Sequence, residues 1–383
     1  MKSTLCNRAT RRPQPALSLW LLSASLITLL STMARAGEAP NVPPYWITDC
    51  VGRMQLSLPS KADVAAVFPK ELIRELDVNR QNWDYHDPNG FSDGTPVYRS
   101  HSAYAGALLI SLPMNDAERL KALDNAGTLK KHGQAYHKKH RRPFVALPLN
   151  EREGLAWRSD NYHTAILRAG DSLAYWSAVD RPGVDLSVER ERNFQRLLSG
   201  LRARPPMTVP SESGVCLPYA FIRDDDGEVF RRIAMTYRLQ QHPDVTIFLE
   251  DRTAEHIEPS TQRRPETYTP SYKLNDFWAP FGRDGGSYRS VWFPPGRNIN
   301  LAGYEGKAAF VEFTHPDGSV DYGYTVAVRG DPDSKEDKPD LFLYVLRHAA
   351  LAKAKGIEPV SKETLLKMAE TIAVSVKRRS VVQ

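Results

Sequence analysis

An apolar segment close to the first residue decides which part of this chain has to fold. Residues 17–30 carry only apolar and small hydroxyl side chains, and four basic residues but no acidic residue precede them. Ala34-Arg35-Ala36 then offers the small-x-small pattern that a signal peptidase cleaves. The run is shorter than the roughly 20 residues of a spanning helix. We therefore predict a signal peptide over residues 1–36 that is cleaved after Ala36, and a mature chain without a membrane anchor.

Cleavage would change the charge of the protein. The whole chain has 51 Lys and Arg against 45 Asp and Glu, a formal charge of +6. Residues 1–36 hold five of the basic residues and none of the acidic ones, so the mature chain has 46 basic residues and a formal charge of +1. Proteins that bind nucleic acid usually attract phosphates with a clear positive surplus. The balance after cleavage argues against a nucleic-acid partner.

Two cysteines, Cys50 and Cys216, remain in the mature chain. An exported protein meets an oxidising compartment, of which the bacterial periplasm is the expected one, and there an even pair of cysteines can form a disulfide. The alternative is two separately buried thiols. Because sequence supplies no geometry, both readings stay open at this point.

The first half of the mature chain shows both strand and helix patterns. We predict strands over residues 51–58 and 104–112, a helix over 116–126 capped by Asn115 and ended by Gly127, a hairpin over 162–179, and a helix over 185–204. Residues 205–214 are rich in proline and small polar residues, which is typical of a linker.

The second half begins with strands and ends with helices. We predict strands over residues 215–223, 229–239, 245–250, 307–314 and 320–329, followed by helices over 341–355 and 362–379, the second with Ser361 as N-cap and basic residues 377–379 at its end. The prediction is an α+β protein of two domains, residues 37–204 and 215–383. Each would be an antiparallel sheet with helices packed on one face.

Motifs that carry chemistry are missing from the sequence. Residues 170–174 begin like the elbow of a serine hydrolase but lack its second glycine, and no phosphate loop, dinucleotide fingerprint or zinc-helix motif is present. We predict no catalytic residue, no cofactor and no metal. Dispersed active-site residues would escape such a search, so catalysis is not excluded.

Three histidines, His132, His137 and His140, cluster among lysines and arginines. Histidines at this density could ligate a metal, but the surrounding positive charge opposes a dication and no carboxylate lies between them. We predict that residues 130–142 form a solvated basic loop, whose functional version would be contact with an acidic patch on a partner.

Aromatic residues gather in turn-rich stretches that we expect to be exposed. Such side chains dominate binding hot spots, although they can also fill small cores beneath long loops. The candidate partner-binding residues are Trp83, Tyr85, Phe277, Trp278, Tyr288 and Trp292. On this reading, replacing Trp278 with Ala would weaken partner capture without unfolding the protein.

Several segments resemble a known family. Residues 214–227 (GVCLPYAFIRDDDG), 242–252 (HPDVTIFLEDR), 315–347 and 360–379 are similar in order and spacing to the C-terminal domain of immunity proteins for type VI secretion phospholipase effectors, of the group-four branch. Residues 49–59, which begin Asp-Cys-Val-Gly-Arg, resemble the opening of the N-terminal domain of that family.

The resemblance implies a periplasmic inhibitor and not an enzyme. Its partner would be a cognate secreted phospholipase, whose active-site cleft or lid the immunity protein obstructs, so that the producing cell is protected from its own toxin. Two alternatives remain on the residues alone: a periplasmic hydrolase with dispersed catalytic residues, and a cell-envelope scaffold or carbohydrate-binding protein whose aromatic side chains stack on sugars.

Overall fold

The computed structural model describes residues 41–79, 88–97, 99–149, 152–159, 162–179, 187–224, 229–256, 269–279 and 286–380. The signal peptide expected over residues 1–36 lies outside these ranges, as do the candidate residues Trp83 and Tyr85. The helices are α1 (Pro69–Glu75), α2 (Asp116–Lys139), α3 (Ser187–Gly200), α4 (Pro270–Trp278), α5 (Ala349–Ala354) and α6 (Lys362–Ser375).

The strands divide between the two halves of the chain. Up to residue 203 they are β1 (Ile47–Val51), β2 (Met54–Leu58), β3 (Ala62–Val64), β4 (Ala66–Val67), β5 (Asn89–Gly90), β6 (His101–Tyr104), β7 (Ala107–Ile110), β8 (Phe144–Leu147), β9 (Gly154–Ser159), β10 (Tyr162–Ala169), β11 (Ser172–Val179) and β12 (Leu201–Ala203). From residue 214 onward they are β13 (Gly214–Leu217), β14 (Ala220–Arg223), β15 (Arg231–Leu239), β16 (Val245–Arg252), β17 (Ser287–Ser290), β18 (Arg297–Leu301), β19 (Tyr304–Thr314), β20 (Val320–Val328), β21 (Asp340–Arg347) and β22 (Lys377–Arg378).

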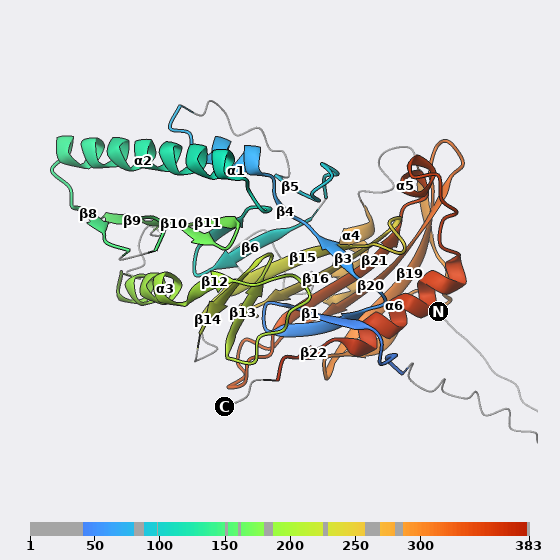
Figure 1. Ribbon diagram of the computed structural model, residues 1–383. Helices are drawn as coiled ribbons and strands as arrows, with labels where there is room; N and C mark the ends of the chain where they lie inside the picture. Colours follow the sequence, from blue (N-terminus) through green and yellow to red (C-terminus); the bar gives the residue numbers. More distant parts are fainter. Residues whose placement is uncertain are drawn as a thin grey trace, which may run out of the picture. The chain divides into compact units, whose positions relative to one another are not determined.

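One antiparallel sheet runs through both halves of the chain (Figure 1). Its 14 strands include the path β17-β19-β20-β21-β16-β15-β6-β7-β11-β10-β9-β8. The halves meet where β15 pairs with β6, with Arg231 opposite Tyr104 and Ala234 opposite His101. β3 also pairs with β15. The predicted α+β class is confirmed. The division into residues 37–204 and 215–383 stays a prediction, and the sheet crosses it.

Helices cover both faces of this sheet, which differs from the one-face arrangement expected. Successive side chains of a strand point to opposite faces. In β21, Leu341, Leu343 and Val345 therefore pack in the core that α6 covers, whereas Phe342, Tyr344 and Leu346 pack against α4. At the other end of the sheet, α2 lies on one face of β9–β11 and α3 on the other (Figure 1). Both faces of the strands are consequently apolar.

The prediction of a helix over residues 341–355 is wrong. Residues 340–347 (DLFLYVLR) form strand β21, all eight of them buried, and only the short helix α5 follows. A strand that is covered on both faces becomes a continuous apolar run without alternation. Such a run has no period that separates it from a buried helix.

Other helices and strands begin or end at residues that differ from the predicted ones, for local reasons. Helix α2 does not end at Gly127, and the basic segment predicted as a loop is helical as far as Lys139. The capping box between Asn115 and Glu118 is present as the N-cap prediction requires. The strands predicted over 104–112 and 215–223 are hairpins, because Ala105 (φ 48°) and Tyr219 (φ 55°) adopt a turn conformation that favours glycine. Gly106 and Pro218, which lie beside these two residues, are turn signals that the strand predictions did not take into account.

The end of the chain also departs from prediction. α6 begins after its N-cap Ser361 as expected, but it ends at Ser375. Residues 377–378 form β22, which pairs with β2. Arg379 then donates to the backbone carbonyls of Pro210, Glu212 and Gly214 at 2.6–2.7 Å. The basic end of the chain therefore holds the 205–214 segment in place and does not complement a helix dipole.

Buried charges connect the first residues of the fold with the last. The guanidinium of Arg231 is fully buried and pairs with Asp251 at 2.8 Å and with Asp337 at 2.9 Å. Arg53 of the β1–β2 turn pairs with Asp224 at 2.8 Å and Asp337 at 3.3 Å. Its backbone N–H donates to Asp251 at 2.7 Å. We call these five residues the buried charge cluster.

The opposite charges in this cluster keep one another ionised despite their burial. Burial would lower the pKa of Arg231, but the carboxylates of Asp251 and Asp337 outweigh burial and raise it above its ordinary value. Burial likewise opposes ionisation of Asp337, yet Arg231 and Arg53 hold its pKa below the usual range. Gly52 has a φ of 58°, and a Cβ there would lie 2.2 Å from an Asp251 oxygen. Glycine is therefore required beside the cluster.

We predict that Arg231→Ala destabilises the fold strongly. It leaves Asp251 buried without its main partner, which costs about 3–5 kcal/mol when a buried ion pair is broken from one side. Urea unfolding of residues 37–383 measures the loss. Arg289→Ala is the matched control, because Arg289 is largely exposed where it pairs with Glu312, and its effect should be much smaller. Equal losses in the two variants would contradict the account.

Candidate functional site

A disulfide ties the two halves of the chain together. Cys50 in β1 and Cys216 in β13 are bonded, with their Cα atoms 5.7 Å apart. Both side chains are fully buried and pack against Phe221. Beside them, the N–H groups of Gly52 and Cys216 donate to each other's carbonyls at 2.9 and 2.8 Å. Of the two readings left open by the sequence, the structure has the bridge and not two separate thiols.

Removing the bridge by the double substitution Cys50→Ser and Cys216→Ser should lower the free energy of unfolding by about 2–5 kcal/mol, because the crosslink restricts the unfolded chain. Thermal unfolding of the mature protein with and without a reductant checks this. The reductant should shift the wild type toward the double variant and leave the double variant unchanged. If the reductant left the unfolding temperature of the wild type unchanged, the prediction would be contradicted.

Three of the candidate aromatic residues are not exposed, so the prediction that they form a partner surface is wrong for them. Phe277 and Trp278 are each 2% exposed and Trp292 is 7% exposed. α4 places Phe277 5.1 Å from the ring of Phe342 and Trp278 4.9 Å from that of Phe313. The turn-rich sequence hides a short helix that Thr269 caps, and its apolar face covers the sheet.

Among the described candidates, Tyr288 remains accessible, at 41%. It lies on β17, at an end of the sheet. The sequence analysis missed Phe293, which is 95% exposed beside the buried Trp292. A proline follows Phe293, but nothing in the composition of this stretch separates the buried ring from the exposed one.

We now predict that Trp278→Ala destabilises the fold by about 3–5 kcal/mol, as truncation of a large buried side chain does. The side chain also fills the space above Gly323, where a Cβ would lie 2.4 Å from the indole. Phe293→Ala serves as the control and should leave the unfolding midpoint in urea almost unchanged. If Trp278→Ala also left the midpoint unchanged, the placement of α4 on the sheet would be contradicted.

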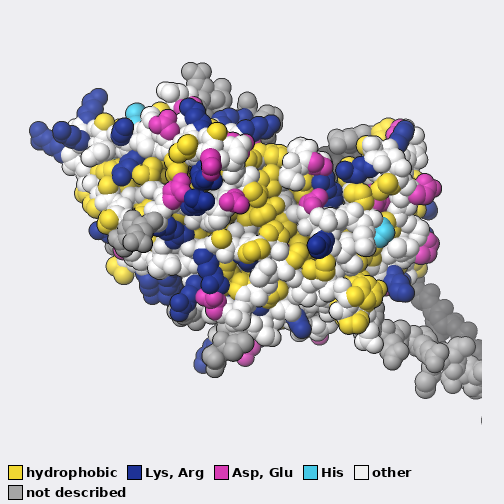
Figure 2. All heavy atoms as spheres, viewed as in Figure 1, with side chains coloured by type: hydrophobic (Ala, Val, Ile, Leu, Met, Phe, Trp, Pro, Cys, Tyr) yellow, Lys and Arg dark blue, Asp and Glu magenta, His cyan; other side chains and the backbone are white. Residues whose placement is uncertain are grey.

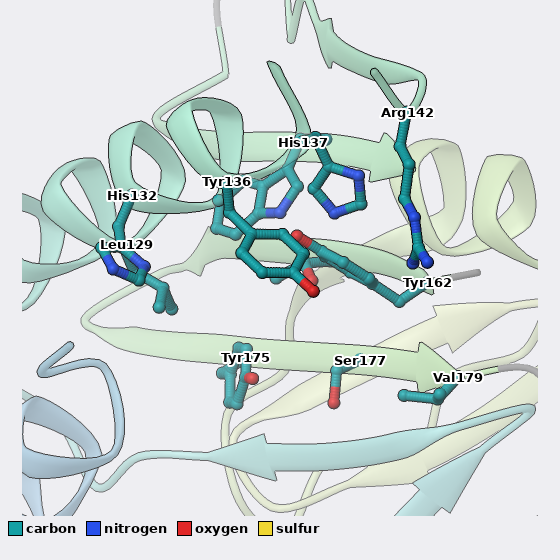
Figure 3. A pocket seen from close by; sticks show the side chains of 12 residues that line it. Leu129, His132, Tyr136, His137, Arg142, Tyr162, Tyr175, Ser177 and Val179 are labelled. Atoms are coloured by element: carbon teal, nitrogen blue, oxygen red, sulfur yellow. The ribbon is translucent and has the colours of Figure 1, made fainter. Parts of the chain in front are cut away.

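A groove lies between α2 and the strands below it (Figure 3). Its volume is about 430 Å³. Figure 3 shows His132, Tyr136 and His137 of α2 above the strand that carries Tyr175, Ser177 and Val179. The lining is aromatic and polar: Leu129, His132, Gly133, Tyr136, His137, Arg142, Trp157, Tyr162, Thr164, Tyr175, Ser177 and Val179. We call this hollow the α2 groove.

Strand parity and side-chain size explain the α2 groove. Thr164 stands opposite Trp157 on one side and Ser177 on the other, so the three side chains form a row beneath α2. Near the start of α2, Ala122 and Ala126 let the helix pack closely on the sheet. Further along the strands, the small Thr164 and Ser177 side chains leave the space below the helix unfilled.

The three clustered histidines of the sequence do not converge on one point. His137 is buried against the rings of Phe144 and Tyr162, at 5.9 and 5.6 Å, whereas the ring of His140 packs on Tyr136 at 4.4 Å. Within the described ranges, no group of three or more His, Cys, Asp or Glu side chains is arranged to hold a metal ion. The histidines are instead parts of the wall of the α2 groove and of the end of its helix.

Comparisons with solved structures find proteins that share this fold. Two solved structures share it: the immunity protein TplEi of the type VI secretion system of Pseudomonas aeruginosa, complexed with an "L" peptide, and the Tle4-Tli4 complex. The first is 16% identical with a TM-score of 0.51 and covers 88% of this chain and 99% of its own. The second is 17% identical with a TM-score of 0.53, and the match covers 88% of this chain and 98% of the other.

A family model narrows the comparison. Residues 208–274 match the Tle cognate immunity protein 4 C-terminal domain. The resemblance of this chain to the immunity proteins of type VI phospholipase effectors is thereby confirmed, in the half where the sequence motifs are densest. No curated protein matches the chain.

Proposed function

We propose that this chain is a periplasmic immunity protein that binds a cognate type VI secreted phospholipase and obstructs it sterically. The observation that carries the proposal is the match of residues 208–274 to the immunity domain, joined to a fold shared over 88% of the chain with two structures of immunity proteins. One of these structures is a complex of Tli4 with Tle4, which supports a protein partner here too.

Export to the periplasm has two supports in this chain. The first 36 residues have the zones of a cleavable signal peptide. The bond between Cys50 and Cys216 is of the kind that persists in oxidising compartments and is rare in the bacterial cytosol. Among the described residues, no helix is long and apolar enough to cross a membrane.

An inhibitor that acts by steric obstruction needs a rigid structure and does not need reactive side chains. An inhibitor that covers the active-site cleft of a lipase, or holds its lid, keeps lipid from the catalytic serine. The buried charge cluster, the Cys50–Cys216 bridge and the shared sheet join both halves of the chain. A partner-binding surface built on such a frame loses little entropy on binding, and tight complexes are mostly governed by slow dissociation.

The proposal predicts a conditional phenotype. Deleting the gene should leave cells healthy when they grow alone, and should make them sensitive to sister cells that deliver the cognate phospholipase. Mixed cultures on a solid surface measure this as loss of the deletion strain. A complementing copy should restore survival. A copy lacking residues 1–36 should not, because the protein would stay in the cytosol.

The two alternative functions predict different results for the deletion strain and for the purified protein. An envelope scaffold would produce a growth or permeability defect without any toxin. A hydrolase would show turnover of lipid or ester substrates by the purified protein that survives repeated purification. Survival of the deletion strain beside toxin-delivering sisters would contradict the immunity role.

A further inference from the structure

One segment of the chain carries a charge that the near-neutral total conceals. Residues 125–150 contain no Asp or Glu but six basic residues: Lys130, Lys131, Lys138, Lys139, Arg141 and Arg142. Since the mature chain has a formal charge of only +1, the rest of it is net acidic by five charges. The positive charge is thus concentrated in one stretch and is absent as a general property of the protein.

These six side chains are not used inside the fold. All but Lys130 are exposed, and none forms an ion pair with a carboxylate of the described residues, in contrast to Arg53 and Arg231 of the buried charge cluster. Figure 2 shows Lys and Arg side chains gathered at the end of α2 that leads into β8. Unpaired cations at this density repel one another, which favours a partner that supplies negative charge.

Three of the basic residues lie at the α2 groove or beside it. Arg142 itself lines the groove. Lys130 and Lys139 flank the face of α2 that carries the lining residues, whereas Lys131 and Lys138 point to the opposite face of the helix. The hollow of about 430 Å³ lies within the range of about 300–1,000 Å³ typical of pockets that hold ligands. Tyr136 remains 48% exposed at its wall. The combination is an aromatic hollow with a cationic rim.

We infer that the α2 groove is a docking site for an acidic surface segment of the phospholipase partner. Apolar or aromatic side chains of the segment enter the hollow against Trp157, Tyr162 and Tyr175, and its carboxylates meet Lys130, Lys139 and Arg142 at the rim. This inference rests on the proposed function, since it names where that partner binds. An anionic bilayer would also be attracted by the cations, but a flat lipid surface cannot enter a concave hollow.

The test compares two charge-matched triple variants of residues 37–383. Lys130→Glu, Lys139→Glu and Arg142→Glu reverse the rim of the α2 groove. Lys335→Glu, Lys353→Glu and Lys367→Glu reverse three exposed lysines elsewhere, so both proteins have the same net charge. Calorimetric titration with the cognate phospholipase gives the affinities. Thermal unfolding of each variant confirms that it is folded.

The rim variant should bind the phospholipase at least about tenfold more weakly than the control variant, and its affinity should depend less on salt, because fewer opposite charges meet. A third variant, Ser177→Phe, fills the hollow without changing charge and should weaken binding at every salt concentration. If it does not fold, Tyr136→Ala replaces it, since this exposed ring can be removed without opening the core.

The outcomes separate the docking site from the function. Equal binding by wild type, rim variant and filled variant overturns the docking site and leaves the immunity role intact. No binding by the wild type overturns both. Binding to phosphatidylglycerol vesicles that the rim variant alone loses, with phospholipase binding unchanged, would assign the basic segment to a membrane and contradict the inference.

Discussion

The buried charge cluster is the interaction on which the rest of the structure depends. Arg231 brings together Asp251 from the neighbouring strand and Asp337 from the segment before β21. Arg53, near the start of the fold, reaches the same Asp337 across 284 residues of sequence. Buried charges of this kind are costly unless all are paired. The cluster therefore fixes where the β1–β2 hairpin, the central strands and the 331–340 segment meet.

The Cys50–Cys216 bond and Arg379 reinforce the same region. The bond lies between β1 and β13, and Arg379 donates to carbonyls of residues 210, 212 and 214. The segment 205–214, whose composition is typical of a linker, is thus held by Arg379 along its second half and by the disulfide two residues after its end. This rigidity suits a protein that works by occupying space, because a frame that does not yield keeps its partner-binding surface in one shape.

Local patterns predicted much of the fold, and long-range packing decided the rest. The hairpin at Gly170-Asp171, the β19–β20 pair and the Ser361 cap are encoded by nearby residues, and all are confirmed. β21 was read as a helix because burial on both faces removes alternation. The burial of Trp278 depends on α4 folding back onto the sheet, and the partners of Arg53 are distant in sequence. Neither leaves a local signal.

The candidate surface shows the same division. The basic stretch after residue 125 is visible in the sequence, but the helix that carries most of it was not predicted. The hollow beneath α2 arises from small side chains on different strands, which no local sequence pattern indicates. The family resemblance indicated the proposed function by another route, since motifs that match in order and spacing can be recognised without any geometry.

The central claim is inhibition by occupation, and a titration of phospholipid hydrolysis tests it most directly. A fixed amount of the cognate phospholipase is mixed with increasing amounts of residues 37–383, and the release of fatty acid is followed. The account predicts that activity falls linearly to near zero at a fixed stoichiometric ratio and returns when the complex is dissociated. Full hydrolysis in the presence of an excess of residues 37–383, with the two proteins bound or not, would contradict it.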